Sequence, residues 1–429
     1  MTSTDSASAP SGSGDQPAGD QSGSSMFASF AVVPFRIIWL GTFLYYLSIF
    51  TGIIARGALA KELGGTNTAL GVVTLAFGAT SLLFTPLGGV MADRFPKRRV
   101  MIASTTLLAI TSGWLGVTEL LDITQFWMLI VVSSMQAVAF SLLVPARMAY
   151  TVELVGPGLI PNAVALSQVS MNFNRVLGPA VAGAMLGVAW LSFQAIYLSA
   201  ALLGVLSAVC FSFLGPGNPD PSRPERAPLA EMVEGLNYAR SNTTIRLVMI
   251  LAIAITMVGF PYVAFLPSVS EDFFQAGASG YAQLSLVGAV GGLIAGLFIA
   301  RAALAQGRSI QFWSAIGIGL SLIFLGWAPT LAVAGLATTL LGAATAGFQS
   351  MNGTMALSAA DPSLHGRVQS LLGLGFSAFG LASLPLGVLA DAIGLRVTLA
   401  LMGATVILIA VVVQFVWSST ERRQAEPIF

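Results

Sequence analysis

The sequence has very little of the chemistry on which soluble enzymes depend. It holds a single cysteine, Cys210, and a single histidine, His365. An internal disulfide and a cysteine metal site are therefore excluded, as are a cluster of histidine metal ligands and a proton relay between two histidines. The net charge of +1 gives no general attraction for nucleic acid. We expect no cofactor, no metal and no nucleic-acid partner.

Charge is also scarce along the chain. Charged residues make up 9% of the 429 residues and hydrophobic residues 55%, and the mean hydropathy is +0.84. This composition is typical of a polytopic membrane protein rather than of a soluble enzyme with one anchor. A membrane enzyme would need acids, histidine or cysteine inside the bilayer, and a sensor would need a further domain. We therefore expect neither an enzyme nor a sensor.

Apolar runs of the roughly 20 residues that cross a bilayer recur along the whole chain. A stretch rich in proline and glycine follows residue 214 and divides the runs into two groups. We predict an all-α membrane protein with twelve transmembrane helices in two six-helix halves. The predicted spans are 37–58, 68–91, 100–118, 125–145, 163–185 and 191–214 in the first half, then 245–267, 281–302, 309–327, 330–350, 367–388 and 394–417.

The predicted domain organisation follows from these runs. Residues 1–30 form a disordered tail, since the first 26 are rich in Ser, Gly and Asp and lack basic residues. The helical halves span 31–214 and 245–417, joined by a linker at 215–244, and residues 418–429 form a second tail. Within the linker, apolar residues from Leu229 to Leu236 recur at helical spacing, which predicts a short amphipathic helix along the membrane.

Basic residues gather in alternate connections between the predicted spans. Because Lys and Arg are enriched on the cytoplasmic side, we expect both termini in the cytoplasm and a multi-pass protein of the cell membrane. The opposite connections hold Lys61 and mainly acids, among them Glu62, Glu119 and Asp272. The basic set consists of Arg94, Lys97, Arg98, Arg99, Arg147, Arg223, Arg226, Arg240, Arg301, Arg308, Arg367, Arg422 and Arg423.

The most densely charged stretch runs from Gly88 to Arg99 and reads Gly-Gly-Val-Met-Ala-Asp-Arg-Phe-Pro-Lys-Arg-Arg. It resembles the loop between helices 2 and 3 of the major facilitator superfamily of secondary transporters, with Pro96 near the place of that family's second glycine. The resemblance implies alternating access and an inner gate. Its predicted gate residues are Gly89, Asp93, Arg94, Arg98, Arg147, Gly178 and Pro179.

Asp93 is the centre of this gate hypothesis. We expect its carboxylate near Arg147 and near the start of the eleventh helix, around Arg367, where unpaired N–H groups favour an anion. There it would lock the inner gate when the transporter opens outward. The alternative is a solvated turn with surface ion pairs, each worth about 0 to 1 kcal/mol.

The fifth span carries a polar stripe. Gln168, Asn172, Arg175 and Pro179 stand at i, i+4, i+7 and i+11, on one helix face. An arginine near mid-membrane costs from about 3 kcal/mol upward unless it faces a watery cavity or a partner. We expect Arg175 to face the cavity; the alternative is that it braces neighbouring carbonyls.

The residues from Gly178 to Gly183 resemble the Gly-Pro-x-x-Gly-Gly signature of antiporters in this superfamily, with Ala182 replacing one glycine. That resemblance favours export over import. More broadly the chain is similar to the exporter branch of the enterobactin exporter and macrolide efflux proteins, which implies proton-driven expulsion of amphipathic drugs, macrolides or siderophores. The matching runs are Pro145-Ala146-Arg147, Glu153-Leu154-Val155, Asn162-Ala163, Asn174-Arg175, Gly178-Pro179, His365-Gly366-Arg367-Val368 and Leu389-Ala390-Asp391.

Aromatic and amide side chains near mid-membrane suit an amphipathic ligand. The predicted cavity residues are Tyr45, Tyr46, Gln136, Gln168, Asn172, Arg175 and Tyr262.

Proton coupling has no obvious site, because no Asp or Glu stands at the centre of a predicted span. The nearest acids lie at helix ends, where a structural role is the simpler interpretation: Asp93, Glu153, Asp361 and Asp391. Protons would then couple at a gate, or indirectly through Arg175 and substrate. The expected partners are a small-molecule substrate, protons and the lipid bilayer, and we expect a monomer. The alternative function is a proton-coupled importer of a small nutrient on the same fold.

Overall fold

The computed structural model describes residues 27–186, 192–218, 237–238, 240, 242–299, 306–361 and 365–425, with backbone alone for 357, 365–377 and 420–425. In these residues helices alternate with short connections and no strand occurs. Of the predicted tail at residues 1–30, residues 1–26 lie outside this part of the chain, as do the amphipathic helix near Leu229 and the last four residues. Residues 28–30 are not disordered, since they belong to a short helix in which Ser29 is buried.

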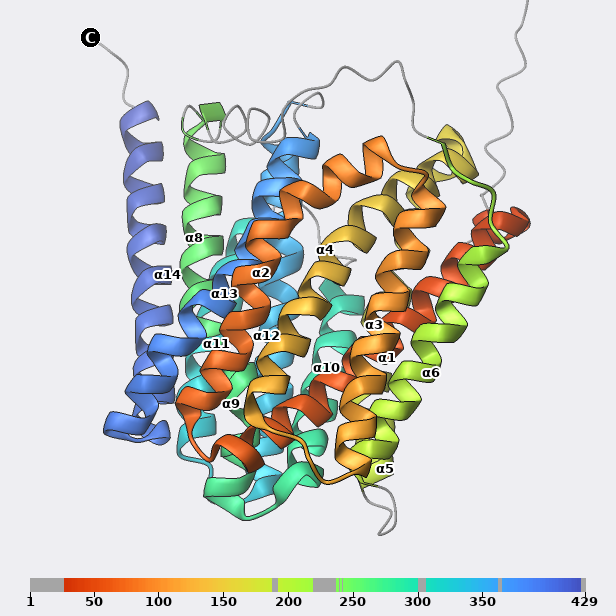
Figure 1. Ribbon diagram of the computed structural model, residues 1–429. Helices are drawn as coiled ribbons and strands as arrows, with labels where there is room; N and C mark the ends of the chain where they lie inside the picture. The colour runs from red at the N-terminus through yellow and green to blue at the C-terminus, as the bar shows by residue number, and fades with distance from the viewer. Residues whose placement is uncertain are drawn as a thin grey trace, which may run out of the picture.

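The first half begins with the short η1 (Ala28–Ala31) and has the short η2 (Pro157–Leu159) before its fifth long helix (Figure 1). Its long helices are α1 (Val33–Gly64), α2 (Asn67–Arg94), α3 (Lys97–Leu120), α4 (Phe126–Val155), α5 (Ile160–Leu186) and α6 (Phe193–Ser212).

In the second half the first span is divided at Pro261, so that α8, α9 and η3 together make one crossing. Each of the twelve predicted spans corresponds to one crossing, which confirms the predicted fold class. The elements are α8 (Thr243–Gly259), α9 (Tyr262–Ser268), η3 (Val269–Phe273), α10 (Gly277–Ile299), α11 (Gly307–Gly326), α12 (Leu331–Ser358), α13 (His365–Ile393) and α14 (Leu395–Ala425).

Ten segments of the described chain are long and apolar enough to cross a membrane, and α13 adds the shorter apolar stretch Ala378–Ile393. The polar α5 is not among the ten, since its middle carries Asn172, Asn174 and Arg175. Large apolar side chains cover the outside of the bundle, including Phe415 at 75% exposure and Phe213 at 73%. A surface this apolar requires lipid around it, and the chain is a multi-pass membrane protein.

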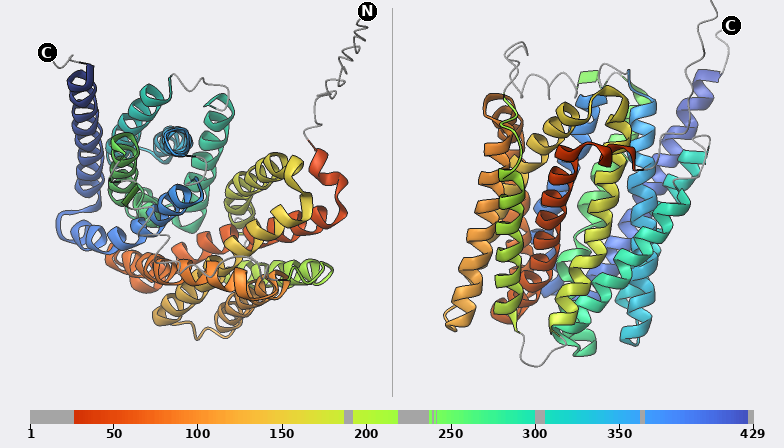
Figure 2. Two further views of the ribbon diagram at one scale, coloured as in Figure 1. Left: turned by 90° about the horizontal axis from the view of Figure 1, so that it is seen from above. Right: turned by 90° about the vertical axis from the view of Figure 1, so that its right-hand side faces the viewer.

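Seen from above, the helices of each half gather in their own group (Figure 2). The two groups meet where α2 packs along α13 and where α5 packs along α10. Close packing at the first contact depends on glycine: a Cβ built on Gly71 of α2 would lie 2.6 Å from the carbonyl oxygen of Ser383 in α13.

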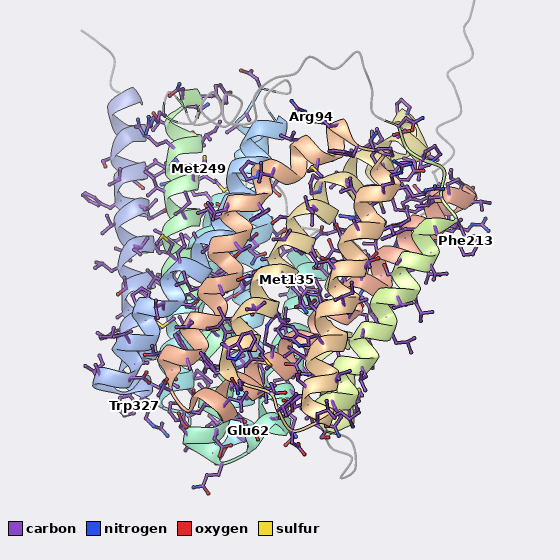
Figure 3. All side chains as sticks on the ribbon, viewed as in Figure 1. Glu62, Arg94, Met135, Phe213, Met249 and Trp327 are labelled. Atoms are coloured by element: carbon purple, nitrogen blue, oxygen red, sulfur yellow. The ribbon has the colours of Figure 1, made fainter. Side chains whose placement is uncertain are left out.

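The two ends of the bundle differ in charge and in packing. Arg94 lies at the upper end of Figure 3, here named the basic end, whereas Glu62 and Trp327 lie at the lower end, here named the closed end. Toward the closed end, one continuous cluster of buried apolar side chains contains residues of both halves, such as Ile54 and Leu322.

Toward the basic end the buried apolar residues divide into two clusters. One belongs to the first half and includes Phe35 and Tyr150, and the other belongs to the second half and includes Val248 and Trp417. Within the described residues, the two halves thus share a hydrophobic core toward one end of the bundle only.

Some helices continue beyond their predicted spans. The fourth was predicted at 125–145, but α4 runs to Val155, because its last turns pack against the connection after α6. Arg147, which the sequence placed in a connection, therefore lies inside α4, and its side chain is buried.

Candidate functional site

The middle of the bundle is built around a close approach of α5 to α1. A Cβ built on Gly178 of α5 would lie 2.5 Å from the Cβ of Phe50 in α1, so a larger residue would separate the two helices. Pro179 follows it and is buried. The predicted pair Gly178-Pro179 thus lies at a contact between α5 and α1. This contact fixes the position of α5, and so of Arg175 almost one turn earlier, relative to α1.

Arg175 lies between the two halves. Its half-buried guanidinium interacts electrostatically with Tyr46 of α1 and with Tyr262 of α9. Three of the predicted cavity residues are therefore close together, although they come from three different helices. A guanidinium inside a membrane protein needs polar surroundings, and these two tyrosines, one from each half, are part of them.

Tyr46 also contacts a second arginine. The Cζ atom of Arg147 lies 6.0 Å from the centroid of the Tyr46 ring, in the range of a cation–π contact. The Nε of Arg147 has no hydrogen-bond partner among the described residues. The Tyr46 side chain therefore interacts with two positive charges, one on α4 and one on α5.

The other predicted cavity residues on α1 and α5 differ in their surroundings. Tyr45 is fully buried in the core of the first half, and its ring meets the edge of Tyr46. Gln168 is exposed and Asn172 is half-buried, and neither side chain has a hydrogen bond to another described residue. In this conformation Tyr45 is a core residue, whereas the two amides are accessible.

Gln136 lies elsewhere, in a second polar group closer to the closed end. It is buried, and its Oε1 accepts a 2.5 Å hydrogen bond from Nη1 of Arg56, while its Nε2 donates to the hydroxyl of Ser112 at 3.3 Å. Sequence reasoning missed Arg56 as a site residue. The signal was available, because Arg56 is a lone arginine within the apolar run 37–58, as Arg175 is within 163–185.

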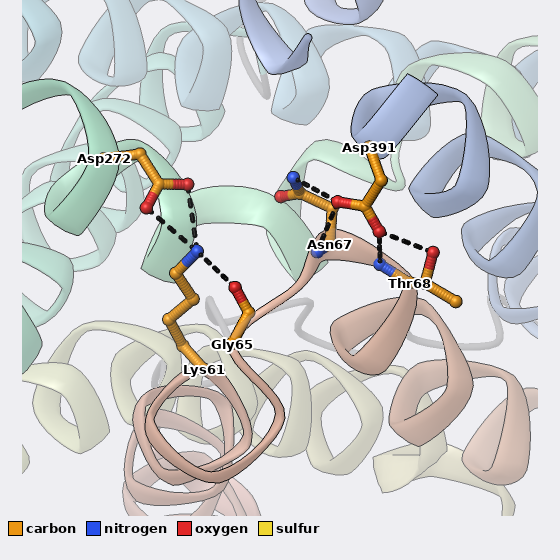
Figure 4. Close-up of polar contacts among 6 residues, drawn as sticks. All are labelled: Lys61, Gly65, Asn67, Thr68, Asp272 and Asp391. Atoms are coloured by element: carbon orange, nitrogen blue, oxygen red, sulfur yellow. Dashed lines mark hydrogen bonds and ion pairs between the residues drawn. The ribbon is translucent and has the colours of Figure 1, made fainter. Parts of the chain in front are cut away.

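At the closed end, two polar contacts join the halves and form what we name the closed-end latch (Figure 4). Asp391 of α13 accepts hydrogen bonds from the backbone and side chain of Asn67, both at 2.9 Å, and of Thr68, at 2.8 and 2.6 Å. Lys61 forms a 2.9 Å ion pair with Asp272. The carboxylate of Asp391 satisfies N–H groups at the start of α2, where the helix dipole favours an anion.

At the basic end, the two basic residues that open α3 hold the connection after α6. The backbone N–H of Lys97 donates to the carbonyl of Gly217 at 2.9 Å, and its Nζ donates to the carbonyl of Asn218 at 3.1 Å. Nη1 of Arg98 donates to the carbonyl of Leu214 at 2.8 Å. We name residues 214–218 the anchored segment.

Two residues of α4 complete this arrangement. The hydroxyl of Tyr150 donates to the carbonyl of Gly215 at 2.7 Å, and Glu153 forms a 3.0 Å ion pair with Lys97. Arg98 and Glu153 therefore have structural contacts within the first half.

The other predicted gate residues are Asp93, Arg94 and Gly89, and the structure describes only part of their surroundings. Asp93 and Arg94 are exposed at the end of α2. The side chains that open α13, Arg367 among them, lie outside the described residues, so the contact between Asp93 and this helix stays a prediction. Gly89 has open space around it, whereas a Cβ on its neighbour Gly88 would lie 2.0 Å from the carbonyl oxygen of Ser141. The close helix contact is thus at Gly88.

Comparison with known proteins agrees with this architecture. Residues 38–380 match the sequence profile of the Major Facilitator Superfamily. The chain is 24% identical to macrolide efflux protein A of Streptococcus pyogenes over 391 residues, which cover 88% of this chain and 94% of that protein. It is 23% identical to the enterobactin exporter EntS of Shigella boydii over 346 residues, covering 79% and 80%.

Among solved structures, the nucleoside transporter NupG superposes with a TM-score of 0.70 at 14% identity, covering 90% of this chain and 99% of that one. Identity this low supports the fold alone. The profile covers most of the chain, and the helices form two groups of six around polar residues from both halves. The protein is therefore a transporter and not an enzyme, and it belongs to the major facilitator superfamily.

Proposed function

We propose that this protein exports small amphipathic molecules, of the drug, macrolide or siderophore kind, by alternating access and in exchange for protons. The observation that carries the proposal is the position of Arg175 between Tyr46 of the first half and Tyr262 of the second. A charged group that interacts electrostatically with a tyrosine of each half is suited to sense a substrate and to respond when the halves move. The efflux functions in the names of two relatives support the direction of transport.

The distribution of contacts supports alternating access. The halves share a core and a latch toward the closed end, and have separate clusters toward the basic end. If the basic end faces the cytoplasm, as the enrichment of Lys and Arg there indicates, this arrangement corresponds to a transporter closed to the outside. In that orientation both termini are cytoplasmic and the protein resides in the cell membrane.

Opening to the outside would break the closed-end latch, and closing the cytoplasmic side would then need new contacts at the basic end. We assign this second role to Asp93, docking at the start of α13, with Arg94 and Arg147 nearby. Proton coupling would occur at such a gate or through Arg175 and substrate, because no carboxylate stands at the centre of a predicted span.

The test is extrusion of amphipathic dyes, macrolides and siderophores from cells that express the chain, with and without a protonophore. Arg175→Ala is the test variant, and Arg246→Ala, which changes an exposed arginine on α8, is the control at matched expression. Protonophore-sensitive extrusion that is lost only in Arg175→Ala is the expected result. Net accumulation of the probes would favour the importer.

A further inference from the structure

Arg56 is a buried positive charge with an incomplete set of partners. Its side chain is 8% exposed, and within the described residues it has one hydrogen bond, to Gln136, and no ion pair. A guanidinium has five N–H donors, and burying an uncompensated charge is costly unless a partner arrives. Four of the five N–H donors of Arg56 therefore have no hydrogen-bond partner among the described residues and are available to an anionic ligand.

The neighbours of Arg56 are neutral hydroxyl groups from both halves. Tyr197 of α6 and Tyr281 of α10 both interact with it electrostatically, and the hydroxyl of Tyr197 is buried without a hydrogen-bond partner among the described residues. Tyr281 comes from the second half and lies over α1, since a Cβ on Gly57 would be 3.0 Å from its hydroxyl. Glu119 interacts electrostatically with Tyr197, but it forms no ion pair with Arg56 in the described structure.

Arg56 is a third positive charge beside α1, after the two arginines that interact with Tyr46. Arg147 of α4 and Arg175 of α5 both interact with Tyr46 of α1. Arg56 lies ten residues after Tyr46 on α1, which is about 15 Å at 1.5 Å per residue. No Asp or Glu stands at the centre of any predicted span of the first half. A molecule that moves from the basic end toward the closed end thus meets arginines and no balancing carboxylate.

We propose that Arg56 binds the acidic group, such as a carboxylate, of an amphipathic substrate in the outer part of the transport path. Gln136 holds the guanidinium in place, and Tyr281 covers the site from the second half until the closed end opens. This inference rests on the proposed function, because it names the substrate class as anionic amphiphiles.

The test uses the purified full chain in detergent and two probes of similar size, benzoate and its neutral analogue benzamide. Thermal unfolding is followed as each probe is titrated into wild type, Arg56→Gln, Arg56→Lys and Arg175→Gln. The control is Arg396→Gln, which changes an arginine at the closed end that hydrogen-bonds the carbonyl of Gly326. A ligand that binds only the folded state raises the Tm with its concentration.

Benzoate is expected to raise the Tm of wild type and Arg396→Gln by several degrees, and benzamide to leave both unchanged. Arg56→Gln should lose the benzoate shift, and Arg56→Lys should keep it at several-fold weaker affinity. A shift that survives in Arg56→Gln, a shift that needs only Arg175, or no shift in wild type at any concentration would overturn the inference. If Arg56→Gln does not fold, an undiminished affinity in Arg56→Lys overturns it instead.

The benzoate titration and the extrusion assay can fail independently of each other. Loss of the benzoate shift in Arg56→Gln, together with no extrusion of any dye by wild type, would contradict export and leave the anion site standing. Protonophore-sensitive extrusion without a benzoate effect would contradict the anion site alone.

Discussion

Asp391 and Thr68 join the two halves through one carboxylate oxygen. Oδ2 of Asp391, at the end of α13, accepts both the backbone N–H of Thr68 at 2.8 Å and its hydroxyl at 2.6 Å. Hydrogen bonds to a charged group are stronger than neutral ones, at about 1.5 to 3 kcal/mol each. Solvent reaches Asp391 and weakens each bond, but the four hydrogen bonds that its carboxylate accepts from Asn67 and Thr68 act together to hold the closed end shut.

Asp391→Asn is expected to open the closed end more often, since the amide cannot accept all of these hydrogen bonds. A loss of about 2 kcal/mol shifts the equilibrium between closed and open by roughly thirtyfold. The readout is maleimide labelling of Ser383→Cys, a buried position packed against Gly71, in a Cys210→Ser background. Labelling should be at least about tenfold faster than in the parent.

Lys61→Gln is the matched control for the latch. The ion pair of Lys61 with Asp272 is partly exposed, and exposed pairs contribute about 0 to 1 kcal/mol. The labelling rate should rise far less than in Asp391→Asn. Equal rates in wild type and Asp391→Asn would contradict the importance of the carboxylate.

Gly88→Ala and Gly89→Ala should differ sharply. The first places a Cβ against the carbonyl of Ser141, whereas the second meets open space. Overpacking of this kind costs about 1 to 3 kcal/mol, so Gly88→Ala should lower the Tm by several degrees and Gly89→Ala should not. If Gly89→Ala is stable but inactive, Gly89 acts in the gate, as the sequence predicted. A normal Tm for Gly88→Ala would contradict the close packing of α2 against α4.

Arg98→Ala should loosen the anchored segment, because Arg98 donates to the carbonyl of Leu214. Trypsin should then cut more rapidly after Arg226, since the earlier Arg223 is followed by Pro224 and its bond resists trypsin. The control is Arg99→Ala, which changes an exposed neighbour, and mass spectrometry identifies the fragments. Identical cleavage in the two variants would show that the anchored segment is held by other contacts.

The positions of the helices could be predicted well from the sequence, but the residues that individual side chains contact could not. The twelve spans follow from the length of the apolar runs, and helical periodicity was enough to single out Arg175. Tyr45 and Tyr46 are adjacent and chemically alike, so composition gave no means of deciding which one faces Arg175. The partners of Lys97 and Arg98 are backbone carbonyls, which leave no pattern in the side chains.

Long-range pairs were the hardest to foresee. Arg56 and Gln136 are 80 residues apart, and only the packing of α1 beside α4 brings them together. The same holds for Asp391 and Thr68, which are 323 residues apart and meet because α13 packs along α2.

The most direct measurement of the central claim is dye movement in proteoliposomes that contain the purified chain and an imposed pH gradient. With the interior acidic, an antiporter lets protons leave while dye enters, so wild type and Arg246→Ala should accumulate dye until a protonophore is added. Arg175→Ala should accumulate none. Dye that moves in the same direction as the protons, or equal accumulation by Arg175→Ala and wild type, would contradict a proton-driven exporter that works through Arg175.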